Sequence, residues 1–150
     1  MGKLQIQIEA LEHKRSKWLT INMIGFCIWD GLRIVNNYIL DNLTYPILTG
    51  IELLGGLIWV VGLFQILRIG KELKHDKQII QIFNDELVEL SQLKSWRFSL
   101  LMTALTQVLI IITTSFVTEI SGIFAAELSI FVLVTSAIGG FLYYNRESNA

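Results

Sequence analysis

The segment Trp29-Asp30-Gly31-Leu32-Arg33 places an acid and a base three residues apart in the middle of an otherwise apolar run. A second acid, Glu52, follows at a similar depth in the next apolar run. A charge at mid-membrane costs roughly 2.5–3.5 kcal/mol on insertion scales, so such residues normally face one another inside a helical bundle. The segment therefore predicts a polar centre within a membrane domain.

The composition of the whole chain agrees with this prediction. Hydrophobic residues make up 53% of the 150 residues, and the mean hydropathy is +0.55. A soluble domain of this length keeps a more polar surface. The net charge of −1 gives no support for nucleic-acid binding, which requires a basic surface. We therefore expect an integral membrane protein with the lipid bilayer as its first partner.

Conventional catalytic and cofactor sites are not predicted. The single cysteine, Cys27, excludes an internal disulfide and a multi-thiolate metal site. The two histidines, His13 and His75, fall outside the apolar runs, so no haem or metal site within the membrane is expected. Phosphate-binding loops and the common hydrolase motifs do not occur. We expect neither an enzyme nor a cofactor.

Four apolar segments are long enough to cross a bilayer, because about 20 helical residues span its ~30 Å hydrocarbon core. They are residues 18–40, 45–67, 98–117 and 123–144. Residues 41–44 and 119–122 form short turns within the first and last pairs, and Pro46 suits the first turn of the second helix. The prediction is an all-α fold, a single domain built as a four-transmembrane-helix bundle.

The distribution of basic residues predicts how the chain is threaded. Four Lys or Arg residues lie in 1–17, six in 68–97 and one in the tail 145–150, whereas the two short turns have none. By the positive-inside rule, both termini and the central loop face the cytoplasm. Residues 1–17 suit a short amphipathic surface helix, although the alternation from Leu4 to Ile8 is equally typical of a strand.

The central loop, residues 68–97, has the pattern of a helical hairpin. Apolar residues recur at heptad-like spacing, and Asn84-Asp85 near the middle suits a turn with a helix N-cap. We expect the second and third spans to continue into the cytoplasm by about 12–15 residues each, or ~20 Å. The opposite arm or a neighbouring copy would cover the apolar seam. Its residues are Leu73, Ile80, Phe83, Leu87 and Leu90.

Polar residues recur in the outer half of all four spans, at different depths. They are Asp30, Arg33, Glu52, Gln107 and Glu127. Asp30 and Arg33 share one helix face and can pair, and Arg33 can also reach Glu52 across the first turn. Glu127, near the start of its span, is more typical of an acid that reaches out to the membrane surface. Three acids against one base favour a bound proton or cation.

Two interpretations of these polar residues remain open. In one, Asp30 or Glu52 binds a proton or cation in a small transporter or ion-channel subunit. In the other, slightly favoured by the residues, Asp30, Arg33 and Glu52 form a structural network that fixes helix register. Glycines beside Glu52 and a small-residue stripe along the fourth span predict close helix packing and self-association. The alternative function is a non-transporting accessory, scaffold or regulatory protein that binds a partner through the cytoplasmic hairpin.

Overall fold

The computed structural model describes residues 2–38, 46–74, 86–116 and 120–148, and these residues form four α-helices. The helices are α1 (Gly2–Tyr38), α2 (Pro46–Lys74), α4 (Glu86–Phe116) and α5 (Gly122–Ser148). Each contains an apolar stretch of 24 to 29 residues, which is long enough to cross a membrane. The prediction of an all-α fold with four such helices is confirmed. Side chains are described for 10–38, 47–71, 89–116 and 120–145.

The starts of two helices test the prediction. Helix α1 runs from Gly2 without interruption, so residues 2–17 continue the first span as helix instead of forming a separate surface element or a strand. Helix α2 begins at Pro46, as predicted for the first turn, where the missing N–H costs no intrahelical bond. The turn residues 41–44 and residue 119 lie outside the described part of the chain, whereas Ile120 and Ser121 are described and directly precede α5.

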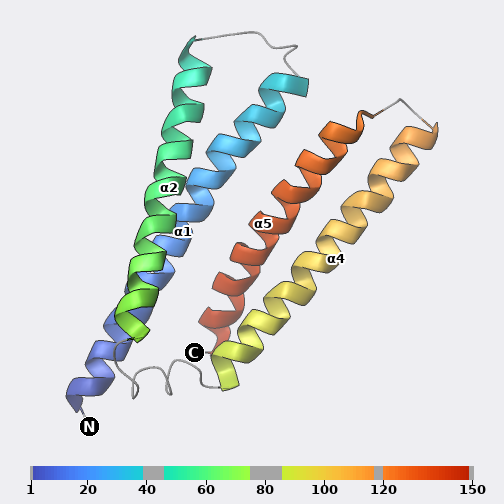
Figure 1. Cartoon of the computed structure of the whole chain (residues 1–150). Coiled ribbons are helices and arrows are strands. Elements are labelled where there is room, and N and C mark those ends of the chain that lie inside the picture. Colours follow the sequence, from blue (N-terminus) through green and yellow to red (C-terminus); the bar gives the residue numbers. More distant parts are fainter. Residues whose placement is uncertain (1, 39–45, 75–85, 117–119, 149–150) are drawn as a thin grey trace.

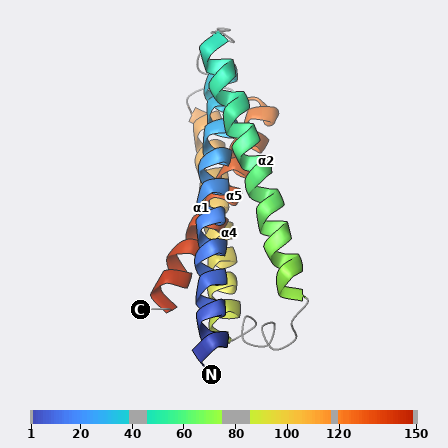
Figure 2. The same cartoon turned by 90° about the vertical axis from the view of Figure 1, so that its left-hand side faces the viewer.

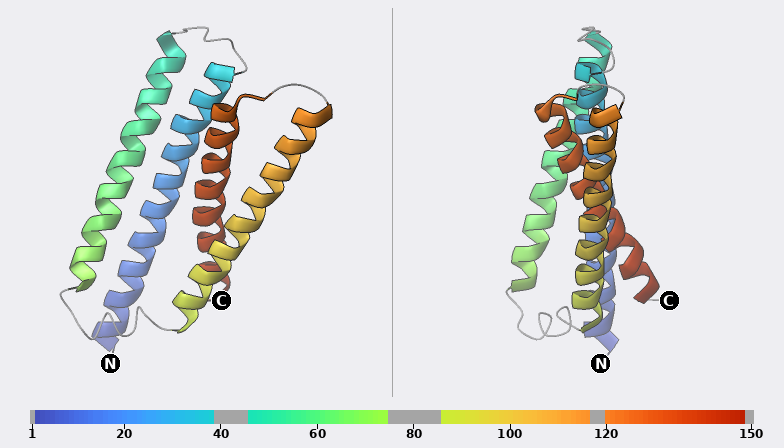
Figure 3. Two further views of the ribbon diagram at one scale, coloured as in Figure 1. Left: turned by 45° about the vertical axis from the view of Figure 1, so that its right-hand side comes forward. Right: turned by 90° about the vertical axis from the view of Figure 1, so that its right-hand side faces the viewer.

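The four helices form an open row in the order α2, α1, α5, α4 (Figures 1 and 3). Two tight antiparallel pairs, α1 with α2 and α4 with α5, meet along a lighter contact between α1 and α5. Figure 2 looks along the row from the α1 and α2 side and shows α2 leaning away from α1 toward its C-terminal end. Both chain ends lie on the side of the molecule where α2 ends and α4 begins, at the bottom of Figure 1. The predicted bundle therefore takes the form of a row with two free edges.

Glycines bring α1 and α2 into backbone contact. A Cβ added to Gly25 would lie 2.6 Å from the backbone nitrogen of Trp59, and one added to Gly55 would lie 2.8 Å from that of Trp29. Asn22, which is buried, donates a hydrogen bond from Nδ2 to the backbone oxygen of Trp59 at 2.9 Å. Because any side chain would separate the two helices here, glycine is the only residue type that permits this distance.

Serines hold α4 against α5. Ser91, Ser95 and Ser99 are spaced four residues apart on one face of α4, and all three are buried. Ser99, with an exposed fraction of 0%, donates from Oγ to the backbone oxygen of Leu133 at 2.8 Å, and Ser95 donates likewise to Ala137. Small polar side chains allow two helices to pack closely, and their hydroxyls can donate hydrogen bonds to backbone oxygens of the neighbouring helix.

Replacing Ser99 with alanine is expected to weaken the α4–α5 pair by about 0.5–1 kcal/mol, because one interhelical hydrogen bond is lost while the cavity created is small. The free energy of unfolding in detergent would measure this effect. Thr114→Val is the matched control, because the exposed Thr114 hydroxyl bonds only within its own helix, to the backbone oxygen of Ile110 at 2.8 Å. Equal losses in both variants would contradict a specific role for the serine row.

The outer surface of the row is apolar. Among the described residues, the buried hydrophobic side chains are Phe26, Ile34 and Ile69, whereas large hydrophobic residues are exposed along most of α2 and α4. Ile47 is 77% exposed and Phe116 is 84% exposed. Exposed apolar surface of this extent is far beyond what a soluble monomer carries and is typical of contact with lipid or with other helices.

The middle of the predicted cytoplasmic hairpin, residues 75–85, falls outside the described residues. Ile80 and Phe83 lie there, and the side chains of Leu73 and Leu87 are also outside the described part. Helix α2 does continue to Lys74 and α4 does begin at Glu86, so both helices extend beyond the expected spans. They occupy opposite edges of the row, and their described parts are not packed against each other. Leu90, on α4, is 51% exposed.

Candidate functional site

An aromatic cluster marks the place where α1 meets α2 on one side and α5 on the other. It consists of Phe26 and Trp29 from α1, Trp59 from α2 and Phe131 from α5. The Trp29 and Trp59 rings stack with centroids 5.0 Å apart, and Phe26 stacks on Phe131 at 6.0 Å. Offset stacking of this kind adds to the burial of the rings. The cluster ties the three helices together near the middle of α1.

A charge cluster, consisting of Asp30, Arg33 and Glu127, lies directly beside the aromatic rings. One Nη atom of Arg33 is 2.9 Å from the Asp30 carboxylate and 3.4 Å from the Glu127 carboxylate. The Arg33 guanidinium also lies over the Trp29 ring, 5.4 Å from its centroid. The side chains of Asp30, Glu127 and Arg33 are 4%, 22% and 35% exposed, respectively. The base therefore bridges two acids carried by different helices.

The charge cluster has unused hydrogen-bonding capacity. Nε of Arg33, Oε2 of Glu127 and Oδ1 of Asn36 are buried and have no hydrogen-bond partner in the described part of the protein. Tyr38 at the end of α1 also interacts with the Glu127 carboxylate. Buried polar atoms normally have a partner, so Nε of Arg33 has a donor, and Oε2 of Glu127 and Oδ1 of Asn36 have acceptors, that the described residues leave unused.

Glu52 is not in the charge cluster. Arg33, which the sequence allows to reach Glu52, pairs with Asp30 and Glu127, and no ion pair of Glu52 occurs among the described residues. Helix α2 approaches α1 through Gly55 and Trp59, whereas Arg33 points toward α5, where it meets Glu127. Glu127, which was predicted among the polar residues but is more typical of an acid at the membrane surface, is the second acid of the cluster.

Gln107 is also separate from the charge cluster. Its amide nitrogen donates to the Ser129 hydroxyl and so bridges α4 and α5. Of the five polar residues in the outer half of the spans, the structure brings together Asp30, Arg33 and Glu127 and places Gln107 and Glu52 elsewhere. The aromatic cluster was not predicted. The signal for it is that Trp29 and Trp59 lie deep within their spans, whereas tryptophan in membrane helices is enriched at the interfaces.

The electrostatics of the site are set by two acids and one base. If all three groups are ionised, the net charge of the charge cluster is −1. Only oxygen ligands and one arginine are present, and no set of three metal-ligating side chains occurs within the described residues. An excess of one acid over the bases within a membrane span favours the uptake of positive charge at one of the two carboxylates.

An apolar groove of about 520 Å³ is lined by residues of α1, α2 and α5. Its lining includes Cys27 and Gly31 from α1, Ile51 from α2 and Phe131 from α5. The groove contains no charged side chain, so its surroundings match lipid tails or an apolar helix. A comparison with models of protein families, with curated protein sequences and with solved structures finds no match for this chain.

Proposed function

We propose that the chain is a multi-pass membrane protein that acts as a small transporter or ion-channel subunit, with the charge cluster as its ion-responsive centre. Four helices long and apolar enough to cross a membrane, together with the exposed apolar surface of α2 and α4, support the membrane assignment. The basic residues concentrate at the end of the row that carries both termini, which supports cytoplasmic termini.

One observation carries the ion-responsive role. Arg33 bridges Asp30 and Glu127, yet one oxygen of Glu127 and the Nε of Arg33 have no hydrogen-bond partner among the residues that the structure describes. An ionisable group within a membrane span is costly and marks a functional site by default. Binding of a proton or cation at Glu127 would neutralise the excess negative charge and weaken the contact of Glu127 with Arg33.

The second candidate is an accessory or scaffold protein without transport activity. Its support is the open row, because the apolar edges of α2 and α4 are free to contact a second copy or another membrane protein. Half-exposed Leu90 near the start of α4 fits the same idea. In this function the charge cluster would only fix the position of α5 against α1.

Thermal unfolding of the purified protein in detergent, as a function of pH and of added monovalent cations, separates the two candidates. If the cluster binds an ion, the wild type is stabilised by about 2.7 kcal/mol at a concentration 100 times the dissociation constant. Glu127→Gln should abolish that response, because the variant keeps the shape of the side chain and loses its charge.

Glu52→Gln is the matched control, because Glu52 is an acid within a span that does not belong to the charge cluster. It should respond like the wild type. A wild type that shows no response to pH or to any cation would reject the ion-responsive centre and leave the accessory function. A positive result would be followed by ion flux measurements in liposomes, where Glu127→Gln should show no flux.

A further inference from the structure

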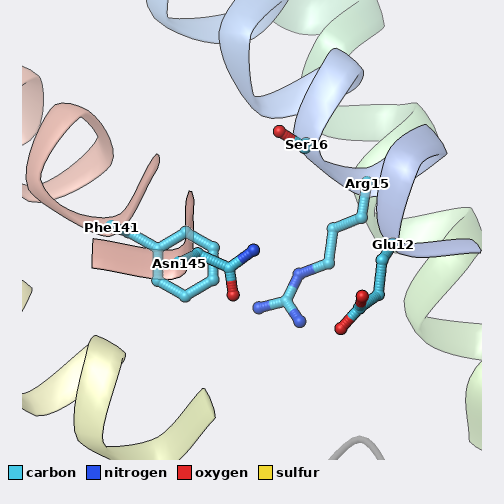
Figure 4. Close-up of a pocket in the computed structure, with 5 residues that line it drawn as sticks. All are labelled: Glu12, Arg15, Ser16, Phe141 and Asn145. Atoms are coloured by element: carbon cyan, nitrogen blue, oxygen red, sulfur yellow. The ribbon is translucent and has the colours of Figure 1, made fainter. Parts of the chain in front are cut away.

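A second polar site lies at the basic end of the molecule, in a small pocket between α1 and α5 (Figure 4). Glu12, Arg15 and Ser16 contribute from α1, and Phe141 and Asn145 contribute from α5. The Arg15 side chain reaches from α1 toward α5, where its guanidinium carbon lies 4.9 Å from the centroid of the Phe141 ring. Stacking on an aromatic face holds the guanidinium plane in place and leaves its N–H edges free to donate.

The donors of Arg15 have no acceptor in the described part of the chain. A guanidinium has five N–H donors, but no hydrogen bond or ion pair of Arg15 occurs among the described residues. The nearby carboxylate, Glu12, lies three residues earlier on the same helix and interacts with Arg15 at longer range. A half-buried arginine in this arrangement is oriented to receive an acceptor from outside the protein.

The surroundings of the pocket are those of a membrane surface. Lys14 and Lys17 flank Arg15 in the sequence, and Lys94 of α4 lies over the Tyr144 ring, 5.9 Å from its centroid. Tyr143, whose ring contacts that of Tyr144, is exposed. Basic pockets between membrane helices, next to interfacial aromatic residues, bind the phosphate groups of anionic lipids.

We propose that the Arg15 pocket binds a phosphate group, and that an anionic lipid headgroup at the membrane surface supplies it. The guanidinium edge would donate two parallel hydrogen bonds to two phosphate oxygens, and Ser16 and Asn145 would supply further polar contacts. The enclosed volume is about 10 Å³, which holds about one water molecule, so the phosphate would lie in the open mouth of the pocket. This proposal rests on the assignment of the chain to a membrane and is independent of the charge cluster.

The two charged residues of the pocket, Glu12 and Arg15, should affect phosphate binding in opposite directions. Its carboxylate repels a phosphate bound at Arg15, so Glu12→Gln should bind anionic lipid more tightly than the wild type does. Arg15→Gln should bind it about tenfold more weakly, because a charged bidentate contact is lost. Lys17→Gln removes the same charge from an exposed position outside the pocket, so its binding should stay within about twofold of the wild type.

The experiment uses the full chain in non-ionic detergent and measures bound lipid by native mass spectrometry. Phosphatidylglycerol, phosphatidylcholine and inorganic phosphate are titrated separately against the wild type and each variant. The expected result is retention of phosphatidylglycerol over phosphatidylcholine, lost in Arg15→Gln, kept in Lys17→Gln and increased in Glu12→Gln. Arg15→Lys, which keeps the charge without the planar pair of donors, should bind with intermediate affinity.

Three outcomes would overturn the proposal. Equal losses of phosphatidylglycerol binding in Arg15→Gln and Lys17→Gln would mean that the lipid is attracted to the basic surface in general and not to the Arg15 pocket. Competition by inorganic phosphate at the same concentration as the lipid would mean that the lipid is not the source of the group. Equal retention of the two lipids by the wild type would mean that the pocket does not select for charge.

If Arg15→Gln does not fold, the binding of phosphatidylglycerol to Glu12→Gln and Arg15→Lys, compared with the wild type, still tests the proposal. A chain that purifies as a monomer without detergent would instead refute the membrane assignment itself.

Discussion

Arg33→Gln is expected to destabilise the folded protein by about 3 kcal/mol, which is the largest effect of any single substitution in the charge cluster. The substitution leaves the Asp30 carboxylate, of which only 4% is exposed, without a cation, and it separates α5 from α1 at Glu127. The value lies at the low end of the range for broken buried ion pairs because the Arg33 side chain is itself a third exposed. Unfolding in detergent, followed by circular dichroism, would measure the loss.

A second substitution shows whether the lost charge is the cause. Asp30→Asn in the Arg33→Gln background removes the unpaired carboxylate and should recover most of the stability, which is the signature of a coupled pair. Arg97→Gln, which removes an arginine from an exposed position on α4, should change the free energy of unfolding by less than about 0.5 kcal/mol. No recovery in the double variant would assign the loss to the other contacts of Arg33, with the Glu127 carboxylate and with the Trp29 ring.

Gly55→Ala is expected to cost about 1–3 kcal/mol through overpacking between α1 and α2. The added methyl group would lie 2.8 Å from the backbone nitrogen of Trp29 and 2.7 Å from a methyl carbon of Ile28, so the helices must move apart. This movement would also pull the Trp59 ring away from Trp29. The unfolding free energy and the tryptophan fluorescence would report the two effects together.

Gly50→Ala is the control for this substitution on the same helix. A Cβ at Gly50 would meet nothing within 4 Å, so the variant should be neutral or more stable by about 0.5–1 kcal/mol, as alanine is a better helix former. Equal effects at positions 50 and 55 would mean that helix propensity, not the distance between α1 and α2, sets the stability.

The four helices could be predicted from the sequence because length and apolar content alone decide whether a segment can cross a bilayer. The continuity of α1 could not, because the alternation from Leu4 to Ile8 suits a strand as well as a helix. The order of the helices in the row was also beyond prediction. The spans are apolar on nearly every face, so the usual amphipathic signal that shows which face is buried is weak.

The sequence predicted how deep in the membrane the polar residues of the candidate site lie, but not which neighbouring helix each of them faces. Counting residues from the ends of the spans places Asp30 and Arg33 at the same level as Glu52, and the structure keeps that pair of neighbours on α1 together. Which acid of another helix reaches Arg33 depends on how far each helix is rotated about its own axis. Sequence spacing leaves that rotation undetermined, so the role expected of Glu52 falls to Glu127.

The unequal packing of the row has a mechanical consequence. Helices α1 and α2 are held together by backbone contact at glycines, and α4 and α5 by buried serines. The contact between α1 and α5 is less extensive and contains the bridge from Arg33 to Glu127. Two stiff levers joined by one soft joint move most easily about that joint, as in hinge and shear motions. Because the bridge from Arg33 to Glu127 lies in this lighter contact, a change of charge at either residue would act on the contact between the two pairs and not within a pair.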